Sequence, residues 1–157
     1  MKNVDALAEQ FRFKYERFIL GCDSLEDLDA WDKDALGEMD VYYENELLGV
    51  MLRLIVADGK ISEKESNYLN RCFGYEQTPE MLSEVYENCR ERYVRPIEED
   101  FAESFRRLEA VNGKLAAAYR ELLSLICDIL IESDGVITPT EVETAQQLRA
   151  LAETAAQ

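Results

Sequence analysis

Residues 115–141 read LAAAYRELLSLICDILIESDGVITPTE, and this stretch decides the fold. From Leu115 to Ile131 almost every residue is apolar. A helix that is apolar on nearly all sides is usually buried in the middle of a bundle. Polar residues interrupt the run too often for a segment that crosses a bilayer. We therefore expect a central helix here, surrounded by the rest of the chain.

The stretch ends in a motif that occurs twice. Residues 134–141 (DGVITPTE) and residues 58–65 (DGKISEKE) share the pattern D-G-x-I-[ST]-x-x-E, and an apolar run precedes each copy. An internal repeat of this kind indicates a duplicated structural unit. We expect two helix–corner–helix units, at about residues 42–74 and 115–152.

Length and composition predict a single all-α domain over residues 1–157. The chain is 47% hydrophobic and 32% charged, which is typical of a folded protein. Three prolines and seven glycines leave little material for turns and favour long helices. We expect a bundle of about seven to eight helices, in which residues 1–40 form acidic N-terminal helices.

Helix start and stop signals place these helices along the chain. Gly21 and Gly74 mark helix ends, Thr78-Pro79 marks a start, and Arg95-Pro96 marks a break. The expected helices span about 4–20, 24–36, 40–58, 62–73, 78–93, 96–110, 115–131 and 138–152.

Charge and residue usage exclude several classes of function. Thirty-three acids against seventeen bases give a net charge of −16, which repels nucleic acid and anionic membrane surfaces. Histidine is absent, so Ser-His and Cys-His nucleophile pairs are impossible. We therefore expect a protein that is not an enzyme.

The cysteines and the N-terminus indicate the compartment. The four cysteines lie far apart without C-x-x-C spacing, and we expect them to be reduced thiols in a cytoplasmic protein. Near the N-terminus, acidic residues occur before any apolar run, so this segment does not resemble a signal peptide.

Most of the repeated motif has a structural explanation as a tight corner between two helices. We expect Gly59 and Gly135 to end helices with positive φ. Ser62 and Thr138 would then be N-caps, and a glutamate three residues after each cap, Glu65 or Glu141, would complete a capping box.

The aspartates of the motif are not explained by a corner. Asp58 and Asp134 follow the C-terminal ends of helices, where the backbone dipole disfavours negative charge. A bound cation would offset this cost. The motif also matches the second half of an EF-hand calcium loop, although the first oxygen ligands of such a loop are missing from both copies. Any site would need further ligands, for example from the other copy. Carboxylate ligands would favour Ca²⁺, Mg²⁺ or Mn²⁺.

Two interpretations stay open for other residues. Arg53 and Asp128 are the lone charges inside the two apolar runs, and they either pair with each other or face solvent at helix edges. Trp31 and the tyrosines could form a binding surface, but core packing is the favoured interpretation.

Residues 55–65 (IVADGKISEKE) resemble the A-D-G-x-[IV]-[ST]-x-x-E signature of the TerB-like family, and residues 133–141 resemble its second copy. That family includes the tellurite-resistance protein TerB and the N-terminal domain of a membrane-anchored DnaJ-type co-chaperone. The resemblance implies an all-helical domain that binds divalent cations in bacterial stress responses, often beside partner proteins at the inner face of the membrane. By motif position, the implied metal ligands are Asp58, Glu65, Asp134 and Glu141.

The sequence therefore predicts a monomeric, non-enzymatic cytoplasmic module that binds a divalent cation, with Ca²⁺ first, and interacts with partner proteins. It would not insert into membranes or bind nucleic acid. The alternative is a purely structural interaction domain, in which both motif copies are helix corners and no metal binds.

Overall fold

The computed structural model describes residues 4–25, 31–55, 61–88, 91, 97–132 and 139–154. These parts of the chain carry eight helices and no strand, which confirms the predicted all-α class. The helices are α1 (Val4–Leu25), α2 (Lys33–Leu36), α3 (Met39–Ile55), α4 (Glu63–Phe73), α5 (Pro79–Asn88), α6 (Ile97–Val111), α7 (Gly113–Ile131) and α8 (Pro139–Thr154).

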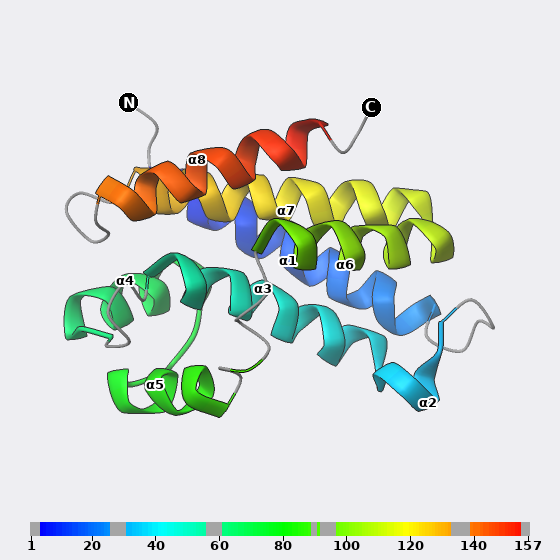
Figure 1. Ribbon diagram of the computed structural model, residues 1–157, viewed down its shortest axis with the longest axis horizontal. Helices are drawn as coiled ribbons and strands as arrows, with labels where there is room; N and C mark the ends of the chain where they lie inside the picture. The colour runs from blue at the N-terminus through cyan, green and yellow to red at the C-terminus, as the bar shows by residue number, and fades with distance from the viewer. Residues whose placement is uncertain are drawn as a thin grey trace.

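Helix α7 is the centre of the bundle, as its apolar sequence predicts. It packs against α1, α6 and α8, and ten of its nineteen residues are buried. Helix α3 crosses the bundle beside them and contacts α1, α6 and α8 (Figure 1). Helices α4 and α5 lie near the C-terminal end of α3, and α2 lies at its other end. The core is thus a bundle built around one helix.

The boundaries of α4 and α5 follow the local signals in the sequence. Ser62 caps α4, and its side chain forms the predicted capping box with Glu65. Gly74 ends α4 in the left-handed conformation, with φ of 77°. The Thr78 hydroxyl accepts a hydrogen bond from the Met81 amide at 3.1 Å, and Pro79 is the first residue of α5.

The predicted end of the first helix at Gly21 is wrong. Helix α1 continues through this residue to Leu25, and the Ser24 hydroxyl donates to the Leu20 carbonyl within the helix. Gly21 instead lies where α1 crosses α7. A Cβ atom at this position would come within 2.6 Å of a Leu115 methyl group. The glycine therefore allows close packing of two helices and does not end one.

The predicted acidic helix over residues 24–36 is also wrong at its start, because Ser24 belongs to α1. In the described part of this region only the short helix α2 follows. Its N-cap is Asp32, whose carboxylate accepts a hydrogen bond from the Ala35 amide at 3.1 Å.

Helix α7 begins two residues before the predicted start. Asn112 separates α6 from α7, and its side-chain oxygen accepts from the amides of Lys114 and Leu115. The predicted glycine corners at Gly59 and Gly135, the Arg95-Pro96 break and the predicted helix end near Tyr93 lie outside the described residues.

Aromatic side chains fill the core at the end of α3 near α2. Trp31 and Tyr43 are buried and pack on each other, and Tyr43 also meets Phe18 and Tyr119 edge to face. This confirms the core interpretation of Trp31. The Trp31 indole N–H donates to the Gly37 carbonyl at 2.9 Å, so its polar group is satisfied inside the core.

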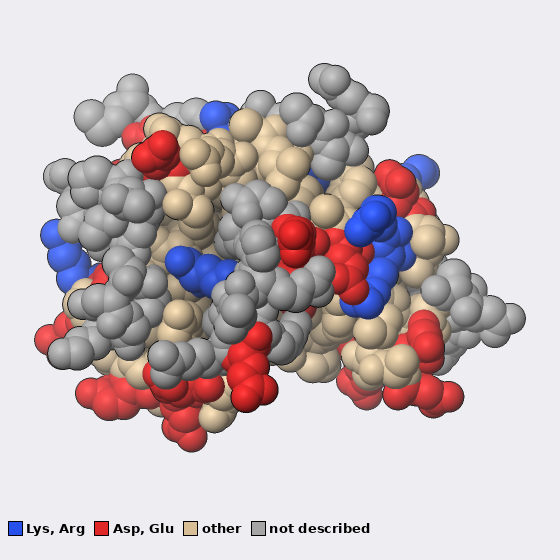
Figure 2. Space-filling model, viewed as in Figure 1, with Lys and Arg blue, Asp and Glu red and all other residues tan. Residues whose placement is uncertain are grey.

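The surface of the described chain is strongly acidic in places. On the face shown in Figure 2, acidic side chains gather along the lower edge, over α5 and around α2. Within the described residues, no helix has the length and apolar character that crossing a bilayer requires.

Two glycines allow a matched test of the helix boundaries. Replacing Gly74 with alanine should lower the free energy of unfolding by about 1 kcal/mol, because its φ of 77° is unfavourable for a residue with a Cβ atom. Gly113→Ala should be neutral or stabilising, because Gly113 lies in the first turn of α7 with open space around it. Urea denaturation measures both, and equal effects would contradict this assignment of the cap.

Candidate functional site

The predicted metal ligands fall largely outside the described residues. Asp58 and Asp134 lie in segments that the structure does not describe, and only the backbone of Glu141 is described, within α8. Across the described residues, no three His, Cys, Asp or Glu side chains are grouped as a metal site requires. Glu65 is the one predicted ligand whose side chain can be placed.

Glu65 forms the capping box of the first motif copy. One of its carboxylate oxygens accepts a hydrogen bond from the Ser62 amide at 2.9 Å, and its own amide donates to the Ser62 hydroxyl at 3.1 Å. The structural role that the sequence predicts for Glu65 is therefore confirmed. The capping box uses one carboxylate oxygen, Oε1.

A hydrogen bond links the flanks of the two motif copies. The Tyr68 hydroxyl, on the helix that follows the first copy, donates to the Ile129 carbonyl at 2.5 Å. Ile129 lies in the last turn of α7, which precedes the second copy. Burial raises the pKa of Tyr68, with Cys72 adding to the effect and the nearby charge of Glu132 contributing less. The hydroxyl thus stays protonated and able to donate.

This bond places the described residues that flank the two copies at one end of the molecule. Figure 1 shows α3 and α7 ending on the same side of the bundle, where α4 and α8 begin. Sequence reasoning could suggest that the copies cooperate, but it could not show this contact. Tyr68 and Ile129 are 61 residues apart in the chain.

The two lone charges of the apolar runs are both ion-paired with other helices. Arg53 pairs with Asp100 on α6, and both side chains are largely buried. Asp128, only 9% exposed, lies 2.7 Å from the Nε atom of Arg149 on α8. The interpretation that each faces solvent is therefore wrong. The structure thus gives Arg53 a partner on α6 and Asp128 a partner on α8.

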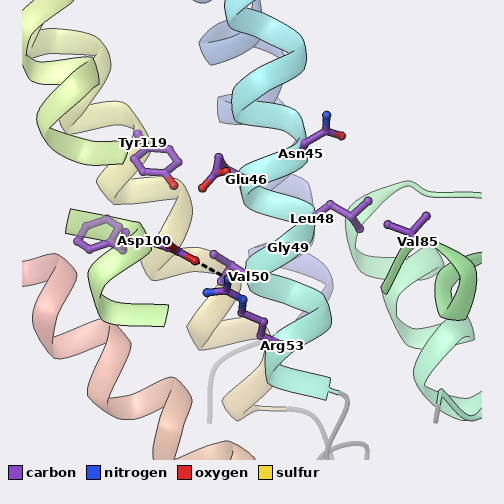
Figure 3. A pocket seen from close by; sticks show the side chains of 10 residues that line it. Asn45, Glu46, Leu48, Gly49, Val50, Arg53, Val85, Asp100 and Tyr119 are labelled. Carbon is purple, nitrogen blue, oxygen red and sulfur yellow. Dashed lines mark hydrogen bonds and ion pairs between the residues drawn. The ribbon is translucent and has the colours of Figure 1, made fainter. Parts of the chain in front are cut away.

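The Arg53–Asp100 pair lines a cavity of about 140 Å³ between α3, α5, α6 and α7 (Figure 3). The apolar part of the lining consists of Leu48, Val50, Val85 and Phe101. The polar part consists of Asn45, Glu46, Arg53, Asp100 and Tyr119. In Figure 3 the Tyr119 hydroxyl and the Glu46 carboxylate lie on the same side of the cavity.

Hydrogen bonds fix the polar end of this cavity. The Ser104 hydroxyl donates to the Glu46 carboxylate at 2.9 Å, and the Tyr43 hydroxyl donates to the Ser104 carbonyl at 2.9 Å. Burial raises the pKa of Tyr119 well above its ordinary value, so this phenol stays neutral. Ser104 thus holds Glu46 and Tyr43 at this end of the cavity, through its hydroxyl and its carbonyl.

Sequence reasoning did not find this cavity, because its polar residues come from three helices. One signal was available. Glu46 and Arg53 are seven residues apart on α3, so they lie on one face of a helix that is otherwise apolar there.

Comparisons of the chain with models of protein families, with curated proteins and with solved structures found no match.

Buried thiols make the stability of the protein sensitive to alkali. Burial raises the pKa of Cys22 and of Cys127 from 9.0 to about 12. Between these values the unfolded chain releases thiol protons that the folded chain retains. The stabilisation is therefore complete below about pH 9 and lost as the pH rises towards 12. The phenol of Tyr119 acts in the same direction.

The free energy of unfolding should accordingly decrease steadily as the pH rises from 9 to 12. Urea denaturation at a series of pH values measures this slope. In the Cys22→Ala and Cys127→Ala variants the decrease should be shallower, when each variant is compared with its own stability at pH 7. A flat profile in the unmodified protein would contradict the assignment of buried, protonated thiols.

The buried ion pair predicts a different cost for each of two arginines. Arg53→Met should lower the free energy of unfolding by about 2 kcal/mol, because Asp100 keeps its charge in a largely buried position. Arg106→Met, on the exposed face of α6, should change it by less than about 0.5 kcal/mol. The double variant Arg53→Met/Asp100→Asn should recover part of the loss, and additive costs would argue against the pair.

Proposed function

We propose that this protein is a non-enzymatic, TerB-like module that binds a divalent cation through carboxylates and interacts with partner proteins in a stress response. The observation that carries the proposal is the hydrogen bond from Tyr68 to the Ile129 carbonyl. It joins described residues that flank the two motif copies, and this supports a site to which both copies contribute ligands.

The electrostatics of this end favour a cation. Helices α3 and α7 both direct their C-terminal ends towards it, and each end carries a partial negative charge. Asp58 follows the last described residue of α3 by three positions, and Asp134 follows the last residue of α7 by three. Three residues extend at most about 11 Å, so each aspartate stays near its helix end. A cation would relieve the repulsion among these negative groups.

The proposed ligands are Asp58, Glu65, Asp134 and Glu141, and they are all hard oxygen donors. Such ligands suit Ca²⁺ best when the site is irregular, because Ca²⁺ accepts more ligands and looser geometry than Mg²⁺. Among the proposed ligands, Glu65 is also the residue that completes the capping box with Ser62.

The cellular setting of the proposal rests on the resemblance to the TerB-like family. The proposed setting is the cytoplasm, where partner proteins would meet the protein at the inner face of the membrane, and we expect a monomer. The net charge of −16 supports this setting, because it opposes direct binding to anionic lipid and to nucleic acid.

A purely structural domain is the second candidate. The observation in its favour is the capping box at Ser62 and Glu65, which explains the motif's serine and glutamate without any ion. In that case the two motif copies would only turn the chain between helices, and added cations would act through ionic strength alone.

Thermal unfolding in different cations separates the two candidates. A ligand that binds only the folded state at about 100 times its dissociation constant stabilises it by roughly 2.7 kcal/mol. For a protein of this size the melting temperature should then rise by about 5–10 °C. Ca²⁺, Mg²⁺ and Mn²⁺ would be compared on chelator-treated protein without a histidine tag, at constant ionic strength.

Charge-matched variants show whether the motif is responsible. Asp58→Asn and Asp134→Asn should keep or gain stability in chelator and lose the calcium shift. Glu38→Gln removes one charge before α3, about 25 Å from the motif end of that helix, and should keep the shift. Loss of the whole shift in either aspartate variant would indicate one shared site. A shift that survives in the double aspartate variant would reject the metal site.

A further inference from the structure

A groove of about 210 Å³ lies between α1 and α7, and no residue of either motif copy lines it. Phe13, Lys14 and Arg17 line it from α1, and Leu115, Ala118 and Glu121 line it from α7. Its walls are two neighbouring helices, so the groove offers an elongated surface rather than a closed pocket. This geometry suits a helix or an extended segment.

Two large apolar side chains of α1 are exposed, Phe13 in the wall of this groove and Leu20 further along the helix. Phe13 is 61% exposed and Leu20 is 67% exposed, the highest values among the large hydrophobic residues described. They are seven residues apart, which places them on the same face of α1. The Arg17 guanidinium lies between them in sequence and 5.5 Å from the centre of the Phe13 ring. An apolar surface with a cation at its centre is therefore presented to solvent.

The charge at the groove is opposite to that of the whole protein. Lys14 pairs with Glu121 across the groove at 2.8 Å, and this pair contributes no net charge. With Arg17 the lining carries two bases and one acid, so the groove has a net charge of +1 in a protein of net charge −16. A binding partner that carries acids beside a large apolar residue would match both features of this surface.

We propose that the groove between α1 and α7 is a docking site for an amphipathic helix of a partner protein, with acidic residues flanking its apolar face. The partner's apolar residues would contact Phe13 and Leu115, while its acids would meet Arg17. This inference rests on the partner-binding part of the proposed function and uses none of the proposed cation ligands.

The charge of the protein favours a partner protein over two other occupants. An anionic membrane would be attracted by Arg17 but repelled by the rest of the chain. A second copy could offer α5, where Met81 is 45% exposed between the exposed acids Glu80 and Glu84. Two copies, each with a charge of −16, would repel one another.

The test uses the whole chain and a synthetic helical peptide as the probe. The peptide has leucines at i, i+4 and i+7 and glutamates on its remaining face, and a second peptide has lysine in place of every glutamate. NMR titration should show shifts along α1 and α7 with the acidic peptide, and affinity should fall as salt rises. The lysine peptide should not bind.

Variants at exposed positions connect the binding to the groove without unfolding the protein. The substitutions Phe13→Ala and Arg17→Glu should each weaken binding of the acidic peptide by a factor of at least about ten. Val41→Ala removes another exposed apolar side chain, on α3, and should leave affinity unchanged. Circular dichroism checks that each variant keeps its helix content.

Three outcomes would overturn the proposal. The first is equal binding of the acidic peptide to the unmodified protein and to Phe13→Ala. The second is self-association in sedimentation experiments that Phe13→Ala abolishes, which would assign the groove to a second copy. The third is binding to phosphatidylglycerol vesicles that Arg17→Glu abolishes. Each titration is run once with chelator and once with Ca²⁺. Peptide binding can then be judged even if the protein binds no cation.

Discussion

Burial of α7 on nearly all sides is the constraint on which the rest of the structure depends. An apolar helix of nineteen residues can be removed from water only if other helices cover it, and α1, α6 and α8 do so. Close covering has local requirements. Gly21 lets α1 approach Leu115, and Arg149 on α8 neutralises Asp128, the charged residue that α7 carries into the core.

The same burial organises the end of the molecule where the motif copies lie. Because α7 is held along its length, its last turn has a fixed position against which Tyr68 can bond. Helix α4 is thereby tied to the last turn of α7. The described residues that flank the two motif copies are thus held together at the C-terminal end of α7.

Local features of the fold could be predicted from the sequence, and features that depend on distant contacts could not. The cap of α4 at Ser62 and its end at Gly74 depend on a few adjacent residues, and both predictions are confirmed. Gly21 misled the same reasoning because its role is set by Leu115, a residue on another helix. The partners of Arg53 and Asp128 also lie on other helices, so their pattern indicated two unusual charges but not Asp100 or Arg149.

The candidate sites follow the same division. The motif could identify Glu65 as a capping residue, which the structure confirms, and as a ligand, which remains a proposal. The cavity beside Glu46 and the groove beside Phe13 depend on which helices become neighbours, and periodicity alone does not specify this. The sequence did not indicate that the Phe13 side chain is exposed, because an apolar residue on an amphipathic helix is ordinarily assigned to the core.

The two proposed sites are coupled through charge even without a change of shape. A divalent cation would reduce the net charge from −16 to −14, since it adds two positive charges to the folded protein. An acidic partner approaching the groove would then meet weaker repulsion from the rest of the chain. At physiological salt this effect is small beyond about 8 Å, whereas at low salt it extends further. If partner binding still depended on the cation at high salt, the two sites would have to be linked through the structure. Helix α7 could provide this link, because it ends shortly before the second motif copy and also forms one wall of the groove.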